Sequence, residues 1–295
     1  MVGPTASGKS EVAMAIATGA GLEVLVADSM QVYRGMDIGT AKPTQAEQRV
    51  VPHSLIDLID PHLDFSVAEY QRAAFATLDR IGREGTGALL VGGTGLYVQA
   101  VVDELELPGQ FSDVRAELEL NADTEGMHRR LAELDPTAAG RMESGNRRRV
   151  VRALEVTIGS GRPFSSFGPG IDAYPLTDWR LAGLELPDAR LGTRISERVD
   201  AMFTAGLVAE VDRLSARAGG LSKTARQALG YKEILAHLDG GMSLDECREL
   251  IVSRTRRFSR RQRSWFRRDP RITWHRFEDN PLEVLPDAPR DWHLT

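Results

Sequence analysis

The sequence predicts an α/β protein in which a parallel sheet is flanked by helices and a helical insertion domain interrupts the core. Apolar runs at 22–27 and 88–91 have the length and composition of buried strands. Between them, residues 67–83 carry apolar side chains at helical spacing. Strands that alternate with helices are typical of a parallel sheet. From about residue 112 strand signals vanish, and they return only at Trp179.

The remaining elements follow from the same patterns, and the loops from Gly and Pro content. We expect a helix at 11–17, a weak strand at 54–59, helices at 114–134 and 147–158 joined by Asp135-Pro136, a loop at 159–175, a strand at 179–186, and helices at 190–205, 208–216 and from 243 to beyond 251. The core is expected over 1–112 and 179–295, and the helical insertion domain over 113–178.

Composition excludes several classes of protein. Hydrophobic residues make up 42% and charged residues 27%, as in ordinary globular proteins. No apolar run is long enough for a transmembrane helix, and the first residues lack the pattern of a signal peptide. The single cysteine, Cys247, excludes an internal disulfide framework and a Cys-rich zinc site. We therefore expect a soluble, cytoplasmic protein that does not engage a membrane.

Charge is segregated along the chain. The net charge is -5, yet the segment from Arg254 to Arg268 holds eight arginines and no acid. Ile251, Phe258 and Trp265 recur every seven residues there, which predicts one apolar stripe along a helix. The arginines could be a solvated face with surface ion pairs. Because no acid lies four residues away within the helix, we favour binding to a nucleic-acid phosphate backbone.

A phosphate-binding motif opens the chain. Gly3, Gly8, Lys9 and Ser10 match the pattern GxxxxGK[ST], and a helical segment follows. In such a loop, backbone amides and the helix N-terminus converge on phosphate oxygens. Lys9 supplies a positive charge, and the Ser10 hydroxyl is a candidate Mg²⁺ ligand. The alternative is a simple Gly-rich turn. The motif refines the fold class to a P-loop NTPase-like sheet.

Two features near the loop need explanation. Only Met1 and Val2 precede Gly3, whereas a phosphate loop normally follows a buried strand. We therefore expect that the true start lies upstream and that about four to eight strand residues are absent. Asp28 comes directly after the apolar run 22–27, at the strand end where open sheets bind ligands. It could be a metal ligand, a ribose binder, a general base or only a helix N-cap.

Further motifs identify a family. The blocks are GPTASGKS (3–10), DSMQVYRGMDIGTAKP (28–43), GGTGLYVQA (92–100), NRRRVVRALEV (146–156), QALGYKE (227–233) and RRQRSWFR (260–267). Together they strongly resemble the tRNA dimethylallyltransferases. After residue 268 the only Cys or His residues are His275 and His293, so the chain resembles the bacterial form, without a C-terminal zinc finger.

The resemblance implies a reaction and its catalytic groups. The loop would bind dimethylallyl diphosphate, and Lys9, Ser10 and Mg²⁺ would neutralise the leaving diphosphate. The diphosphate-binding residues would be Gly3, Pro4, Thr5, Ala6, Ser7, Gly8, Lys9 and Ser10. Asp28 would take the proton from N6 of the target adenosine. Thr94 would contact the target nucleotide, although without the family it could be only a turn residue.

The resemblance also implies a tRNA site. The target is the adenosine on the 3′ side of the anticodon, which must leave the base stack. The insertion would clasp the anticodon stem, and the enzyme would act as a monomer. Residues matching the family's tRNA-binding positions are Asp28, Ser29, Met30, Gln31, Thr94, Arg115, Arg148, Arg149, Val150, Val151, Arg152, Gln227, Gly230, Tyr231, Lys232, Arg260, Arg261, Gln262, Arg263, Trp265 and Arg267.

Three alternatives share part of this pattern. A small-molecule P-loop kinase would have the same loop and the Asp after a strand, but it would not need the segment from Arg254 to Arg268. An isopentenyltransferase acting on free adenine nucleotides has the same fold, and the arginine clusters favour tRNA over it. An RNA-binding module with a degenerate loop would not need Lys9, Asp28 and Thr94. The loop alone would also admit a nucleotide such as ATP.

Overall fold

The computed structural model describes residues 1–285, so residues 286–295, which include His293, lie outside the described part. The chain divides into two compact units. Unit 1 comprises residues 1–102 and 176 onward, and unit 2 comprises Asp103–Pro175. Unit 2 therefore starts at Asp103 rather than at 113 and ends at Pro175 rather than at 178. The start differs because the helix that precedes unit 2 in the chain belongs to unit 1 and ends at Val102.

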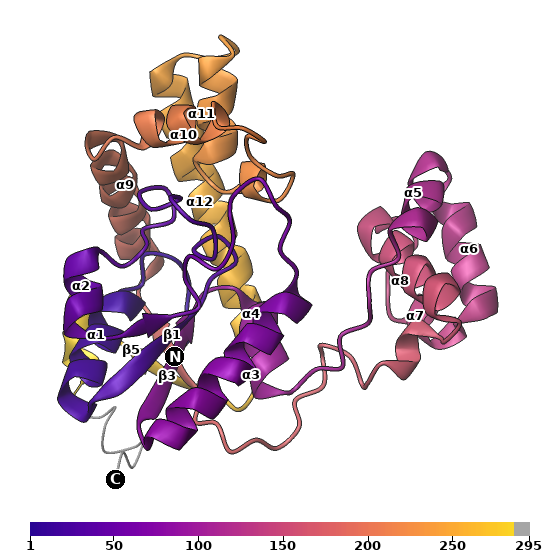
Figure 1. The fold of residues 1–295 in the computed structure, drawn as a ribbon, viewed down its shortest axis with the longest axis horizontal. Helices are drawn as coiled ribbons and strands as arrows, with labels where there is room; N and C mark the ends of the chain where they lie inside the picture. Colours follow the sequence, from indigo (N-terminus) through magenta and orange to yellow (C-terminus); the bar gives the residue numbers. More distant parts are fainter. Residues whose placement is uncertain (286–295) are drawn as a thin grey trace. The chain divides into compact units, whose positions relative to one another are not determined.

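Unit 1 is an α/β fold with parallel strand pairs, which confirms the predicted class (Figure 1). Its strands are β1 (Leu22–Ala27), β2 (His53–Ser54), β3 (Gly87–Gly92), β4 (Ala182–Glu185) and β5 (Thr273–Arg276). The strand order is β2-β1-β3, and β4 pairs with β5. Val2 lies between the two groups: its N–H donates to the Ala182 carbonyl at 2.8 Å, and the Met1 carbonyl accepts from Gly92 N–H at 3.1 Å. Val2 thus bridges β3 and β4.

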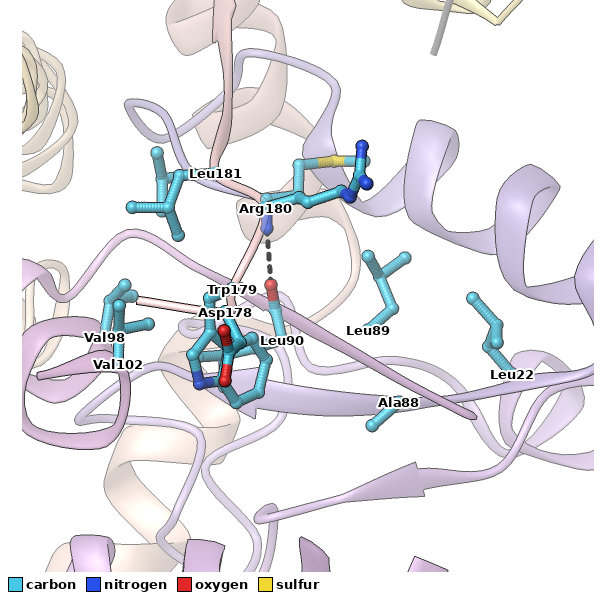
Figure 2. Close-up of a pocket in the computed structure, with 12 residues that line it drawn as sticks. Leu22, Ala88, Leu89, Leu90, Val98, Val102, Asp178, Trp179, Arg180 and Leu181 are labelled. Atoms are coloured by element: carbon cyan, nitrogen blue, oxygen red, sulfur yellow. Dashed lines mark hydrogen bonds between the residues drawn. The ribbon is translucent and has the colours of Figure 1, made fainter. Parts of the chain in front are cut away.

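The chain before the phosphate loop forms only this two-residue bridge. The Met1 amine donates to the Leu90 carbonyl at 2.6 Å, and burial lowers the pKa of the amine to about 5. A groove of about 290 Å³ adjoins it. Figure 2 shows the apolar side chains of Leu22 and of β3 along this groove, with Trp179 and Leu181 also lining it.

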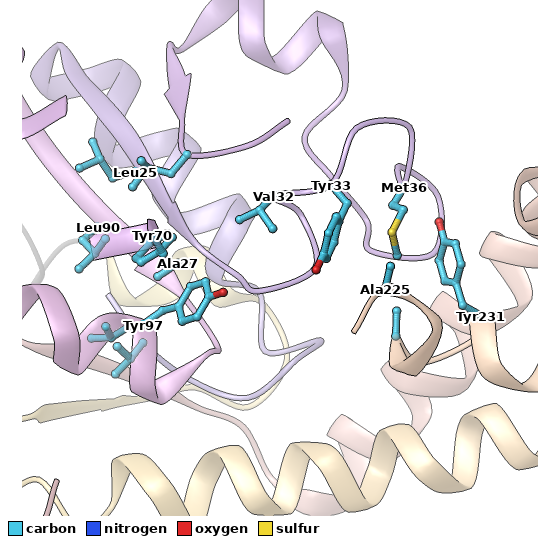
Figure 3. Packing of buried hydrophobic residues seen from close by; sticks show 14 of the residues in the cluster. Leu25, Ala27, Val32, Tyr33, Met36, Tyr70, Leu90, Tyr97, Ala225 and Tyr231 are labelled. Carbon is cyan, nitrogen blue, oxygen red and sulfur yellow. The ribbon is translucent and has the colours of Figure 1, made fainter. Parts of the chain in front are cut away.

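Helices cover the sheet and extend beyond it. The helices of unit 1 are α1 (Lys9–Ala20), α2 (Gln45–Val50), α3 (Val67–Glu84), α4 (Gly95–Val102), α9 (Asp188–Thr204), α10 (Leu207–Ser215), α11 (Tyr231–Leu238) and α12 (Leu244–Phe266). A capping box of Ser66 and Glu69 starts α3. Tyr70 of α3 and Tyr97 of α4 stack with ring centroids 4.2 Å apart. Figure 3 shows both rings near Ala27 and Leu90, in a core that continues to Tyr231.

Three sequence predictions need correction here. The strand expected at 54–59 is only His53–Ser54, because Leu55 and Asp57 adopt positive φ angles of 69° and 52° that end an extended strand. The helix expected at 114–134 is two helices, interrupted at 121–123. The stripe expected on α12 is also wrong at Phe258, which lies outside the hydrophobic clusters. The buried face of α12 instead contains Cys247, Ile251, Thr255, Ser259, Gln262 and Phe266.

Unit 2 is entirely helical. Its helices are α5 (Ser112–Leu120), α6 (Thr124–Leu134), α7 (Pro136–Gly140) and α8 (Arg147–Ser160). Leu131, Val150 and Leu154 are central to its own hydrophobic cluster. The Asp135 carboxylate caps α7 through Ala138 N–H at 3.0 Å and accepts two hydrogen bonds from Ser165. The unit therefore has an internal core and polar anchors of its own.

Candidate active site

The phosphate loop connects Val2 to α1. Gly8 has a φ of 80°, which a side chain would oppose, and no side chain caps the helix there. The first amides of α1 are therefore open to an anion. Lys9 Nζ donates to the Pro4 carbonyl at 2.6 Å, which places the ammonium over the loop. Ser10 is exposed, and the buried Ser7 hydroxyl has no hydrogen-bond partner in the described structure.

A second cation, Arg198 of α9, lies within electrostatic range of Lys9, and the sequence analysis did not select it. Burial of Lys9 and, to a smaller extent, the charge of Arg198 lower the pKa of Lys9 to about 7, while the charge of Asp28 opposes the shift. Burial also lowers the pKa of the Arg198 guanidinium, and the charge of Asp28 again opposes the shift. The sequence signal that could have found Arg198 is its spacing from Ile195. Arg198 follows this buried residue by three positions on an amphipathic helix, which places it near the apolar face. Two cations therefore lie within electrostatic range of one carboxylate, that of Asp28.

Asp28 and Thr94 lie together where β1 and β3 end. Asp28 Oδ1 accepts the Met30 N–H at 2.8 Å, which holds the carboxylate in a tight turn. Thr94 Oγ1 accepts the Ser29 N–H at 3.1 Å, and Thr94 N–H donates to the Ala27 carbonyl at 3.2 Å. Because both strands are parallel and adjacent, their carboxyl ends share one sheet edge. A half-buried carboxylate and a hydroxyl therefore border the phosphate loop.

The arginines between Arg254 and Arg268 differ in their surroundings. Three form ion pairs with acids on other elements: Arg254 with Glu233, Arg263 with Asp188, and Arg267 with Glu185. Arg257 and Arg260 are exposed and form no ion pair within residues 1–285. Arg261 and Arg268 lie over the rings of Phe258 and Trp265, at 5.7 and 4.6 Å from the ring centroids. Phosphate binding was favoured over surface ion pairs for this segment, yet at least three of the eight arginines form ion pairs.

The segment 227–232 has exposed and buried members. Gln227 and Lys232 are exposed, whereas Gly230 and Tyr231 are buried. The Tyr231 hydroxyl donates to Glu210 at 2.5 Å. The sequence motif placed Tyr231 at the tRNA site. This expectation is corrected for its side chain, which is enclosed and hydrogen-bonded inside unit 1.

Glu210 is a buried carboxylate that sequence reasoning missed. It also accepts the backbone N–H groups of Asp37, Ile38 and Gly39 at 2.8–3.0 Å. The same loop binds Gln31, whose Nε2 donates to the Thr40 carbonyl at 3.0 Å. Gln31, which was expected at the tRNA site, therefore stabilises this loop through a side-chain hydrogen bond. No motif marked Glu210, because its partners are backbone amides about 170 residues away.

The residues of unit 2 that were predicted to bind tRNA are partly exposed and partly buried. Arg148 and Arg149 are exposed at the start of α8. Val150 and Val151 were also expected at the tRNA site. Their side chains instead belong to the core, with exposed fractions of 0% and 3%. The remaining two arginines bind the buried Glu155: Arg152 at 2.7 Å and Arg115 at 3.3 Å. Glu155 additionally accepts the Phe111 N–H at 3.0 Å, so this carboxylate organises the unit.

Within residues 1–285, no group of three or more His, Cys, Asp or Glu residues could hold a metal ion. At the phosphate loop, Ser10 offers an exposed hydroxyl, an oxygen ligand of the kind that a hard cation such as Mg²⁺ accepts. No described helix is both long and apolar enough to span a membrane.

Known proteins resemble this chain over almost its whole length. The family model for IPP transferase matches residues 31–269. A tRNA dimethylallyltransferase of Streptomyces coelicolor is 49% identical over 277 residues, which cover 93% of this chain and 88% of the relative. The solved tRNA isopentenylpyrophosphate transferase of Bacillus halodurans is 37% identical, with a TM-score of 0.72, and the match covers 99% and 94% of the two chains. A solved eukaryotic dimethylallyltransferase acting on tRNA, 23% identical, shares the fold with a TM-score of 0.81 over 98% of this chain and 76% of that one.

Proposed function

We propose that this chain, which belongs to the IPP transferase family, transfers the dimethylallyl group of dimethylallyl diphosphate to N6 of a tRNA adenosine. The observation that carries the proposal is that Asp28 and Thr94 lie at the carboxyl ends of the adjacent parallel strands β1 and β3, beside the phosphate loop, with Lys9 and Arg198 within electrostatic range of Asp28. Cations suit a diphosphate leaving group, and a carboxylate suits removal of a proton from an amine. The reaction needs both at one site.

The loop residues would bind and orient the diphosphate. The free amides at the start of α1 and the charge of Lys9 would hold its oxygens, and Arg198 would add a second cation from α9. Lys9 would leave the Pro4 carbonyl and turn to the anion. Mg²⁺, bound by the Ser10 hydroxyl and diphosphate oxygens, would neutralise part of the leaving-group charge.

Asp28 would act as the general base. The bond from the allylic carbon to the diphosphate oxygen breaks, a bond from that carbon to adenine N6 forms, and the N6 proton passes to Asp28. Diphosphate leaves with the electron pair of the broken bond. Thr94, held against Ser29, would orient the target nucleotide, so that N6, the carboxylate and the allylic carbon meet.

Exposed arginines support tRNA as the acceptor. Arg257 and Arg260 on α12, and Arg148 and Arg149 on α8, have no acidic partner within residues 1–285 and suit phosphate contacts. We propose that the target is the adenosine on the 3′ side of the anticodon and that unit 2 contacts the anticodon stem. A cytoplasmic location would place the enzyme with this substrate.

The experiment is mass spectrometry of nucleosides from unmodified tRNA incubated with the enzyme, Mg²⁺ and dimethylallyl diphosphate. The expected product is a prenylated adenosine. Parallel incubations contain ATP in place of the diphosphate, or AMP in place of tRNA. Consumption of ATP without prenyl transfer would favour a kinase, and faster prenylation of AMP would favour the free-nucleotide enzyme.

A further inference from the structure

The Gln262 side chain joins α12 to both loops of the candidate active site. Its Oε1 accepts the Thr5 N–H of the phosphate loop at 2.8 Å. Its Nε2 donates to the Gly93 carbonyl at 2.9 Å, directly before Thr94. The side chain is only 7% exposed. Both ends of the amide are therefore used inside unit 1, and neither points to a free surface for RNA.

The glycines of the turn fit around this contact. A Cβ built on Gly93 would lie 2.3 Å from Gln262 Nε2, and a Cβ on Gly95 would lie 2.2 Å from the Trp265 ring. Both distances are far below a van der Waals contact. The Gly92–Gly95 turn and the Gln262–Trp265 segment are thus complementary surfaces, which explains why both motifs occur in one chain.

We propose that Gln262 is a positioning residue for the diphosphate site rather than a tRNA contact. It fixes the Thr5 amide, and thereby the path of the phosphate loop, relative to the turn that holds Thr94. The inference rests on the proposed function for the identity of the diphosphate ligand. It also assigns the Thr5 N–H to Gln262, so the anion would bind other amides of the loop.

The helix separates this role from RNA binding. Arg260 and Arg261 precede Gln262 and are exposed, whereas Gln262 and Ser259 are buried. At 3.6 residues per turn, neighbouring positions point about 100° apart, so one segment serves two surfaces. Substitutions on the two faces should therefore affect different substrates.

The test compares Gln262→Met with Arg257→Gln. Met has a similar volume and removes both hydrogen bonds without leaving a large cavity. Calorimetry measures the Kd of inorganic diphosphate with Mg²⁺, and filter binding measures the Kd of tRNA without diphosphate. For Gln262→Met we expect diphosphate affinity to fall about tenfold to a hundredfold, as for a misplaced loop, with tRNA affinity within about twofold of wild type. Arg257→Gln should give the opposite pattern.

A melting curve accompanies each variant. If Gln262→Met does not fold, Gly93→Ala replaces it, because the added methyl group would displace the same amide. Weakened tRNA binding with unchanged diphosphate affinity would overturn the inference and make Gln262 a tRNA contact. Unchanged affinity for both would also overturn it. Wild-type protein that binds diphosphate but does not prenylate tRNA would refute the proposed reaction instead.

Discussion

Diphosphate binding should depend on pH through Lys9. In the free protein, burial and Arg198 lower the pKa of Lys9 from 10.5 to about 7, so this ammonium is half deprotonated near neutral pH. A bound diphosphate places negative charge against Nζ and raises the pKa again. Binding therefore takes up a proton, and alkaline pH opposes it.

The magnitude follows from this shift. Above pH 7 the free protein is mostly neutral at Lys9, so each further pH unit weakens binding about tenfold, or about 1.4 kcal/mol. Between pH 6 and pH 8 the Kd of diphosphate should rise by roughly a factor of ten through this group alone. The terminal phosphate of the ligand ionises in the same range and strengthens binding as pH rises, so it has the opposite sign.

Calorimetry on wild type and Lys9→Met separates the two effects, because both proteins meet the same ligand. Wild type should lose about tenfold more affinity than the variant between pH 6 and pH 8, and it should take up an extra proton, seen in buffers of different ionisation enthalpy. Arg198→Met should move the wild-type midpoint to higher pH, because it removes a charge that lowers the pKa of Lys9. Equal pH profiles for wild type and Lys9→Met would refute the assignment of Lys9.

Two further predictions concern the base and the arginine helix. Asp28→Asn should keep tRNA affinity but lower single-turnover rates by about two to four decades, and a near-normal rate would exclude it as the base. Changing Arg257, Arg261 and Arg268 together to Gln should reduce the salt slope of tRNA binding by about two to three units, whereas an unchanged slope in a protein with normal melting would leave them as a solvated face.

The fold class and the position of the phosphate motif at the start of a helix were predictable because they depend on local sequence. The apolar run at 22–27 forms β1 with those bounds, and the run at 88–91 forms the middle of β3. The phosphate motif precedes α1, as its pattern requires. Prediction was wrong at 54–59, where single residues with positive φ angles end the strand and no periodicity marks them.

Residues that act across the tertiary structure were not predictable in the same way. Arg198 reaches the phosphate loop from α9, and Glu210 binds a loop far away in the sequence. Neither carries a local motif, since their partners are a distant lysine and backbone amides. Gln262 was found by its motif, but its burial and its two hydrogen bonds were not predictable, because a motif does not tell which helix face is buried.

Charge density alone did not separate the arginines that can bind RNA from those that hold the fold. Arg254 binds a carboxylate that is 1% exposed, so its loss would leave a buried charge unpaired and reduce stability. Arg257, three residues later, is exposed and has no ion pair within residues 1–285. The two arginines should therefore differ when each is changed to Gln: Arg254→Gln should lower the melting temperature, and Arg257→Gln should lower tRNA affinity in a salt-dependent manner. A helix that interacted with RNA through all its arginines equally would give the same binding loss at both positions.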